Sequence, residues 1–401
     1  MVSVLRKVAQ LISGNILAQL VVFSSLPILS RLYTPIEFGE FAIFVSLVSI
    51  LSVVSSGRYE LAIMLPSIKK DYLAITKLSI QISVVFSALV GLGLLMAGSY
   101  FEFSSIEKSL IVVALISIGI NRALQYFNNK KQDYNIMAKA KVLQSTSQVL
   151  VQLSTFSFGT LGLIGGHIIG FVVGLIHLLP LNFKKLKFNK VTVKDFALLK
   201  KYSDFPRYSV IGALADTTAI QLPVLIFSKY IGAYEVGVFS FALRVVSAPM
   251  TLMSTAITQV LYNNFVSDSK HGNLLLLTFK SAIVLFLVYL PIHLFLITYS
   301  ESLFKVAFGD EWVLSGYIAT ILSYIMWIRF IVSPLSPIVN LKGNVKYGVA
   351  WQILYFLSLF STLYYFRELE FESLLWVFVL HEIILYGIYF IIILCLARNN
   401  D

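Results

Sequence analysis

Residues 374–396 read LLWVFVLHEIILYGIYFIIILCL, and Glu382 is the only Asp, Glu, Lys or Arg among them. An α-helix rises about 1.5 Å per residue, so about 20 apolar residues cross the hydrocarbon core of a bilayer. A stretch of this length with so little charge predicts a membrane-spanning helix.

Similar stretches fill almost the whole 401-residue chain. Predicted spans lie at 8–30, 39–64, 78–98, 109–127, 142–159, 161–181, 207–230, 237–262, 274–298, 313–340, 348–366 and 374–396. The composition agrees, with 58% hydrophobic and 13% charged residues, against about 45–50% and about 25% in soluble domains. The sequence therefore predicts an all-α polytopic membrane protein with about twelve transmembrane helices.

Several classes of protein are disfavoured. The single cysteine, Cys395, cannot form a disulfide within the chain, and the five histidines are scattered without metal-ligand spacing. We find no phosphate-binding glycine loop, no HExxH and no large loop with paired acids. We therefore expect no metal, no cofactor and no enzymatic activity. The first apolar run is too long for a signal peptide and is interpreted as an uncleaved helix.

Basic residues accumulate in alternate connections, which predicts the orientation by the positive-inside rule. One set of connections holds Lys69, Lys70, Lys130, Lys131, Lys184, Lys185, Lys187, Lys190, Lys194, Lys200, Lys201, Lys342 and Lys346. The opposite set is acidic and holds few basic residues. Both termini are therefore predicted to be cytoplasmic. This topology accounts for the net charge of +11 without a nucleic-acid partner.

The long Lys-rich connection at 182–206 divides the chain into two predicted six-helix lobes, 1–190 and 191–401. Residues 31–41 (RLYTPIEFGEF) are echoed by 229–239 (KYIGAYEVGVF), each with a basic residue, a short loop and Glu-x-Gly opening the next helix. An even number of helices per lobe predicts a pseudo-two-fold axis along the membrane normal, as in transporters built from repeats. Shared helix-end chemistry is the alternative explanation for the echo.

Seven charged residues inside or near the ends of the spans are candidates for function. A charge at the bilayer centre costs about 2.5–3.5 kcal/mol, so seven facing lipid would cost on the order of 20 kcal/mol. Cations suit an anionic ligand such as a pyrophosphate, and buried acids suit coupling to a proton or sodium ion. The predicted substrate-binding cations are Arg58, Arg122, Arg244 and Arg329, and the predicted ion-coupling acids are Asp216, Glu382 and Glu60.

The depth of these residues leaves alternatives open. Arg58, Glu60 and Arg122 lie near cytoplasmic span ends, where long side chains can reach the lipid headgroups. Arg58 and Glu60 also face nearly opposite sides of a helix, so they can share a site only if the helix breaks at Gly57.

The other four charges are placed differently. Asp216, Arg329 and Glu382 lie deeper, where a cavity or an internal ion pair is favoured. Arg244 lies about two turns from the outer end of its span, where it could line a vestibule or bind a lipid phosphate.

Uncharged polar residues suggest a polar path. Asn15 and Gln19 are four residues apart, and Gln144, Gln148 and Gln152 form a stripe at the same spacing. We expect Asn15, Gln19 and Gln148 to lie along this path. Helix–helix contact is the alternative for the glutamine stripe.

Three stretches carry a resemblance to a known family: 12–19 (ISGNILAQ), 29–39 (LSRLYTPIEFG) and 57–65 (GRYELAIML). They resemble bacterial polysaccharide exporters of Wzx type, the O-antigen flippases, which belong to the multidrug/oligosaccharidyl-lipid/polysaccharide (MOP) superfamily. The resemblance implies a V-shaped bundle of two six-helix lobes around a cationic cavity in the bacterial inner membrane. It also implies flipping of an undecaprenyl-pyrophosphate-linked oligosaccharide by alternating access, with ion antiport as an open question.

Expected partners are this lipid-linked oligosaccharide, membrane lipids and other polysaccharide-assembly proteins. Two further functions stay open. A cation-coupled drug exporter of the same superfamily would need an acid-dominated site, which the excess of arginine disfavours. A membrane-embedded polymerase or ligase would need a sizeable outer domain, whereas the outer loops hold about 15 residues or fewer.

Overall fold

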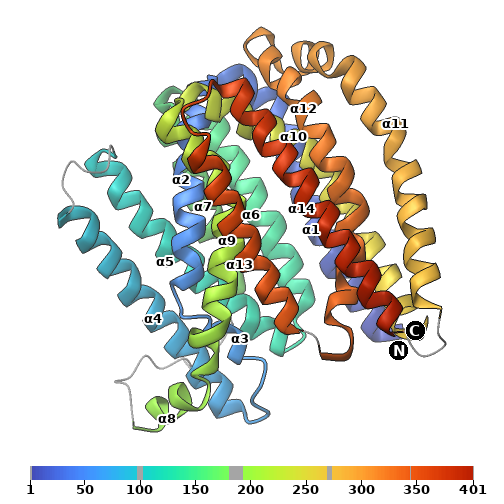
Figure 1. Cartoon of the computed structure of the whole chain (residues 1–401). Helices are drawn as coiled ribbons and strands as arrows, with labels where there is room; N and C mark the ends of the chain where they lie inside the picture. Colours follow the sequence, from blue (N-terminus) through green and yellow to red (C-terminus); the bar gives the residue numbers. More distant parts are fainter. Residues whose placement is uncertain (1, 97–102, 180–192, 269–272, 344, 401) are drawn as a thin grey trace. The chain divides into compact units, whose positions relative to one another are not determined.

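The computed structural model describes residues 2–96, 103–179, 193–268, 273–343 and 345–400, and the regular secondary structure in these ranges is helical (Figure 1). The described part forms two compact units, one of residues 1–33 and 43–221 and one of residues 34–42 and 222–401. The predicted division into lobes at 190/191 stays a prediction.

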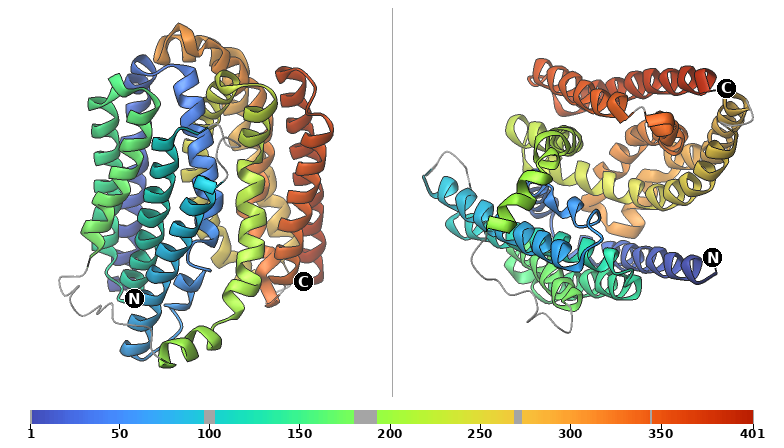
Figure 2. Two further views of the ribbon diagram at one scale, coloured as in Figure 1. Left: turned by 90° about the vertical axis from the view of Figure 1, so that its left-hand side faces the viewer. Right: turned by 90° about the horizontal axis from the view of Figure 1, so that it is seen from below.

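The first unit contains the helices of the N-terminal half. They are α1 (Val2–Leu32), most of α2 (Pro35–Val54), α3 (Tyr59–Ala62), α4 (Lys69–Met96), α5 (Ser105–Lys130), α6 (Tyr134–Ser154), α7 (Thr160–Leu178), α8 (Val193–Lys201) and the first part of α9 (Val210–Tyr230). Within it α1 and α7 both pack on α6, and α4 packs on α5 (Figures 1 and 2).

The second unit contains the start of α2, the end of α9 and the remaining helices. These are α10 (Ala233–Asp268), α11 (Leu274–Phe308), α12 (Val313–Val332), a 3₁₀ segment (Ser333–Gly343), α13 (Val345–Tyr365) and α14 (Phe371–Asn400). Helix α12 packs on α10, α11 and α14, which makes it the central helix of this unit.

Each predicted span overlaps a long helix, and ten helices in the described ranges are long and apolar enough to cross a membrane. Helices α6 and α13 are not among the ten. For α6 the sequence explains this, because it carries Lys139, Lys141 and the three glutamines of the stripe. The all-α membrane fold is confirmed, and the count of twelve spans stays a prediction.

Several predicted span boundaries are corrected, as three of them show. The span at 39–64 is interrupted, because α2 ends at Val54 and α3 begins at Tyr59. The span at 313–340 is α-helical only to Val332, and a 3₁₀ segment that contains Pro337 follows. Helix α11 continues to Phe308, ten residues past the predicted end at 298, because hydrophobic periodicity does not record where a helix leaves the membrane.

The repeated Glu-x-Gly motif has a structural explanation at the start of α2. The backbone N–H of Thr34 donates to Glu37 Oε2 at 2.7 Å, and the N–H of Glu37 donates back to Thr34 Oγ1 at 3.4 Å. This reciprocal pair is a capping box, which satisfies backbone donors that a helix start leaves unpaired. Pro35 at the first helical position needs no such donor.

The two glycines of the motif meet in the second unit. A Cβ added to Gly39 would lie 1.8 Å from the carbonyl oxygen of Ala233, and one added to Gly237 would lie 1.8 Å from that of Pro35. In the echoed segments Pro35 corresponds to Ala233, so the contact is reciprocal. The starts of α2 and α10 therefore contact each other through backbone atoms in a reciprocal arrangement. Neither glycine position leaves room for a side chain.

Aromatic side chains pack beside this crossing. Trp312 is fully buried, and its ring centroid lies 4.0 Å from that of Phe241 and 5.2 Å from that of Phe38. Phe308 at the end of α11 adds an edge contact to Phe241 at 4.9 Å. Large buried rings of this kind stabilise the ends of α2, α10 and α11 against one another.

We predict that Gly39→Ala and Gly237→Ala each destabilise the protein by about 1–3 kcal/mol, because the new methyl group overlaps a carbonyl of the facing helix. The matched control is Gly387→Ala in α14, where an added Cβ meets no atom within 4 Å. The measurement is thermal unfolding of the purified protein in detergent. Equal melting temperatures for the Gly39 and Gly387 variants would contradict the prediction.

Candidate functional site

The helix break after α2 brings Arg58 and Glu60 into one neighbourhood. Gly57 and Arg58 have φ angles of 58° and 61°, in the left-handed region. A non-glycine residue pays roughly 1–2 kcal/mol to adopt this conformation, so Arg58 is held there by its surroundings. On one continuous helix the two side chains would point to nearly opposite sides. Because the helix breaks at Gly57, Arg58 and Glu60 can contribute to one site.

Adjacent contacts fix this break. The Tyr59 hydroxyl donates to the carbonyl of Leu199 in α8 at 3.1 Å. Helix α8 is also joined to α4 through Lys77 and Asp195, whose charged atoms lie 3.6 Å apart with both side chains nearly buried.

Arg122 on α5 lies in the same cluster. Its Nη1 donates to the carbonyl of Ser52 at 2.8 Å, and its Nη2 donates to the Ser52 hydroxyl at 3.0 Å. Glu60 is 1% exposed and accepts a hydrogen bond from the Ser56 hydroxyl. Arg122 interacts electrostatically with both Glu60 and Arg58.

Lys141 on α6 is a further member that sequence reasoning missed, and it also interacts electrostatically with Arg122. We call Arg58, Glu60, Arg122 and Lys141 the cationic cluster. It holds three cations and one carboxylate, a net charge of +2. Arg58 Nε is buried and has no hydrogen-bond partner among the described protein atoms. A buried donor of this kind in a cationic environment suits an anionic ligand.

In the second unit the structure pairs Arg329 of α12 with Glu382 of α14. Arg329 Nε donates to Glu382 Oε2 at 3.1 Å, and Nη2 donates to the same oxygen. The other carboxylate oxygen accepts from the Tyr355 hydroxyl at 2.5 Å. Glu382 is 0% exposed, so both of its oxygens are satisfied away from solvent. Of the two alternatives left open for these residues, the structure favours the internal ion pair.

Aromatic and polar neighbours complete the pair. The Arg329 guanidinium lies 5.3 Å from the ring centroid of Tyr386, a cation–π distance. His381, next to Glu382 in sequence, has its Nδ1 3.9 Å from Glu382 Oε1, and its Nε2 forms a 3.2 Å hydrogen bond with the Ser358 hydroxyl. Tyr355 carries no signal in the sequence that sets it apart from the chain's other tyrosines, so only the fold reveals it.

Two predicted site residues join neither group. Arg244 lies with its guanidinium 5.7 Å from the ring of Phe41, and Asp216 is half-buried on α9. Across the described ranges neither forms an ion pair. Their assignments as substrate-binding cation and coupling acid stay predictions.

The glutamine stripe packs on a glycine face of α7. Gln152 Nε2 donates to the carbonyl of Leu163 at 3.0 Å, and a Cβ added to Gly170 would lie 2.9 Å from Gln148 Cβ. This arrangement favours helix–helix contact for Gln148. Asn15 and Gln19 lie on an exposed face of α1. The polar path through all three stays a prediction.

In the part of the chain that the structure describes, no group of three or more His, Cys, Asp or Glu residues is placed to hold a metal ion. The two groups of charged residues described above are the cationic cluster, with one carboxylate, and the buried Arg329–Glu382 ion pair.

Comparison with known proteins places this geometry in context. A family model described as "Polysaccharide biosynthesis protein" matches residues 28–315. The teichuronic acid biosynthesis protein TuaB of Bacillus subtilis is 22% identical over 251 residues, 59% of this chain and 50% of TuaB. The succinoglycan biosynthesis transport protein ExoT of Rhizobium meliloti is 21% identical over 347 residues, 81% of this chain and 66% of ExoT. The chain thus spans about half to two-thirds of the length of these curated relatives.

Solved structures share the fold. An inward-facing multidrug resistance MATE transporter of the MOP superfamily aligns with a TM-score of 0.65 at 15% identity, over 98% of this chain and 95% of that one. A MOP superfamily transporter from Pyrococcus furiosus aligns with a TM-score of 0.58 at 16% identity, over 98% and 96% of the two chains. The predicted MOP fold is confirmed, and the chain is a multi-pass membrane protein.

We predict that Arg329→Met or Glu382→Leu alone destabilises the protein by about 3–5 kcal/mol, because each leaves a buried charge without its partner. The double variant should lose markedly less than the sum of the two, since an apolar pair replaces the ion pair. Thermal unfolding of the four proteins in detergent measures this coupling. Arg244→Met serves as a control for loss of an arginine outside the pair, and strictly additive losses would contradict the prediction.

Proposed function

Because the chain belongs to the polysaccharide biosynthesis protein family and has the fold of MOP transporters, we propose that it is a flippase for a lipid-linked oligosaccharide. The substrate is an oligosaccharide on undecaprenyl pyrophosphate, and it moves from the cytoplasmic to the outer leaflet of a bacterial inner membrane by alternating access. O-antigen is one such repeat unit. The relatives' names refer to teichuronic acid and to succinoglycan, so the sugar is left open.

The observation that carries this proposal is the excess positive charge of the cationic cluster. Its members lie near the ends of α2, α5 and α6 that adjoin Lys69, Lys70, Lys130 and Lys131, the cytoplasmic side by the positive-inside rule. A pyrophosphate that enters from the cytoplasmic leaflet carries the complementary charge at that depth. Arg58 supplies a buried donor without a protein partner, and guanidinium groups bind phosphate oxygens strongly.

The Arg329–Glu382 pair takes a different role in this proposal. A hydrogen-bonded pair with no net charge attracts a phosphate only weakly. We therefore assign substrate binding to the cationic cluster and not to Arg329. Protonation of Glu382 would remove the anionic partner of Arg329 inside the second unit. That makes the pair the candidate for ion coupling. Reversing the charge of Arg329 would place two carboxylates together, so it tests folding rather than transport.

Flipping is tested by the leaflet distribution of undecaprenyl-linked oligosaccharide in cells with and without the gene. We expect the intermediate to be trapped on the cytoplasmic side without it, because the headgroup cannot cross the hydrocarbon core unaided. If the intermediate reaches the outer face regardless, the proposal fails. Single units that accumulate on the outer face would instead indicate a polymerase or ligase.

The cationic cluster is tested in the same strain with Arg58→Gln combined with Lys141→Gln. Removing two cations lowers the cluster's net charge from +2 to 0. Since each hydrogen bond to a charged group contributes about 1.5–3 kcal/mol, flipping should fall by at least about tenfold. The control is Lys70→Gln, which removes an exposed cation on the same side of the membrane. Wild-type flipping by the double variant at normal protein abundance would overturn the role of the cluster.

A further inference from the structure

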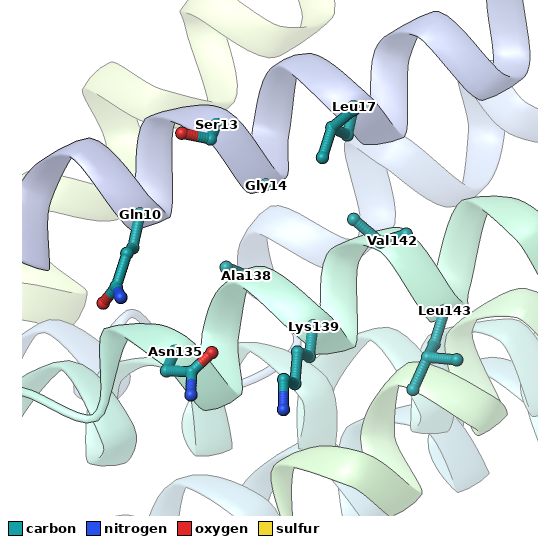
Figure 3. A pocket seen from close by; sticks show the side chains of 9 residues that line it. All are labelled: Gln10, Ser13, Gly14, Leu17, Asn135, Ala138, Lys139, Val142 and Leu143. Carbon is teal, nitrogen blue, oxygen red and sulfur yellow. The ribbon is translucent and has the colours of Figure 1, made fainter.

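A groove lies between α1 and α6 within the first unit, apart from the cationic cluster (Figure 3). Its volume is about 420 Å³. The two helices run in the same direction past it. In Figure 3 Gln10 faces Asn135 at one end and Leu17 faces Val142 at the other, with Gly14 and Ala138 between them. The groove therefore has a polar end and an apolar end.

The close crossing of the helices makes the groove. A Cβ added to Gly14 would lie 2.5 Å from the Cβ of Ala138, so the backbones meet where both side chains are small. The larger residues on either side diverge from this point and leave the groove open to the surface. Leu17 and Leu143 remain 53% and 42% exposed.

The groove carries a cation. Gln10 of α1 and Asn135 of α6 line its polar end, and Lys139 of α6 lies one turn further along, between Asn135 and Leu143 (Figure 3); Gln10, Asn135 and Lys139 are all exposed. No carboxylate lines the groove, so the charge of Lys139 is not balanced within it.

The depth of the polar end fits a lipid headgroup. Helix α6 begins at Tyr134, directly after the basic pair Lys130 and Lys131. Lys139 lies five residues into the helix, about 8 Å along its axis. With the predicted orientation this is the headgroup region of the cytoplasmic leaflet. The apolar end then lies deeper, at the level of the acyl chains.

We propose that this groove binds an anionic phospholipid of the cytoplasmic leaflet. The lipid phosphate is held by the Lys139 ammonium and by the side-chain amides of Gln10 and Asn135. One acyl chain lies along Leu17 and Leu143. The polar-to-apolar gradient of the groove and its single uncompensated cation carry this inference, which does not depend on the transported substrate.

The test measures binding of phosphatidylglycerol to the purified full chain by native mass spectrometry, with phosphatidylcholine as the zwitterionic reference. A basic residue near the membrane surface contributes about 1 kcal/mol to anionic lipid binding, so Lys139→Gln should weaken phosphatidylglycerol binding about five-fold. Lys70→Gln removes another exposed cation on the same predicted side of the membrane, outside the groove, and should leave binding within about two-fold of wild type. Equal effects of the two variants would show general attraction to a basic surface and overturn the proposal.

A second variant separates the groove from the charge. Leu143→Trp leaves Lys139 in place and fills the apolar end of the groove, so phosphatidylglycerol binding should fall. The protein should still fold, because the side chain of residue 143 is exposed. Unchanged binding by this variant would overturn the proposed acyl-chain path.

Two further ligands distinguish other occupants. Soluble glycerol phosphate at the same concentration should not compete with phosphatidylglycerol, because it lacks acyl chains. Competition would show that the groove binds free anions and would overturn the proposal. If undecaprenyl phosphate competes and phosphatidylglycerol does not bind above the phosphatidylcholine reference, the groove belongs to the carrier lipid and the proposal is wrong. Failure of this proposal leaves the flipping assay unaffected, because that assay follows the substrate rather than the groove.

Discussion

The hydrocarbon core of a bilayer offers no partner to a polar group, and the rest of this structure depends on that constraint. Backbone donors and acceptors are satisfied within long helices, and the helices account for all the regular structure in the described ranges. The same constraint governs buried charges. Glu382 has no exposed surface, yet both carboxylate oxygens are hydrogen-bonded, by Arg329 and by Tyr355. Removing either partner would leave a buried charge without compensation, which is strongly destabilising.

The two units deal with charge in different ways. The second unit neutralises Arg329 and Glu382 against each other. In the first unit Arg122 interacts electrostatically with Arg58, with Lys141 and with the one carboxylate, Glu60, and the backbone of Arg58 adopts a left-handed conformation. A strained backbone conformation such as that of Arg58, beside an excess of positive charge, is typical of a functional position rather than of packing alone. This contrast leads us to assign substrate binding to the first unit and coupling to the second.

Part of the candidate site could be predicted from the sequence. Charged residues in apolar runs stand out, so Arg58, Glu60, Arg122, Arg329 and Glu382 were all identifiable. Their partnerships were not, because Arg329 and Glu382 lie 53 residues apart. Lys141 was missed since the predicted span began at 142, whereas α6 begins at Tyr134. Span ends are set by capping and tertiary contacts, which hydrophobic periodicity does not report.

By itself the sequence determined the all-α membrane fold, the approximate positions of the helices and the echoed Glu-x-Gly motif, because these follow from local composition and spacing. Only the tertiary structure decided what the motif does: Glu37 caps α2, and Gly39 meets Gly237's helix through backbone atoms. It also decided which charges cancel and which accumulate. Those outcomes depend on distances between helices that are remote in sequence. Electrostatic and steric energies change over a few ångströms, and a sequence pattern does not record distances on that scale.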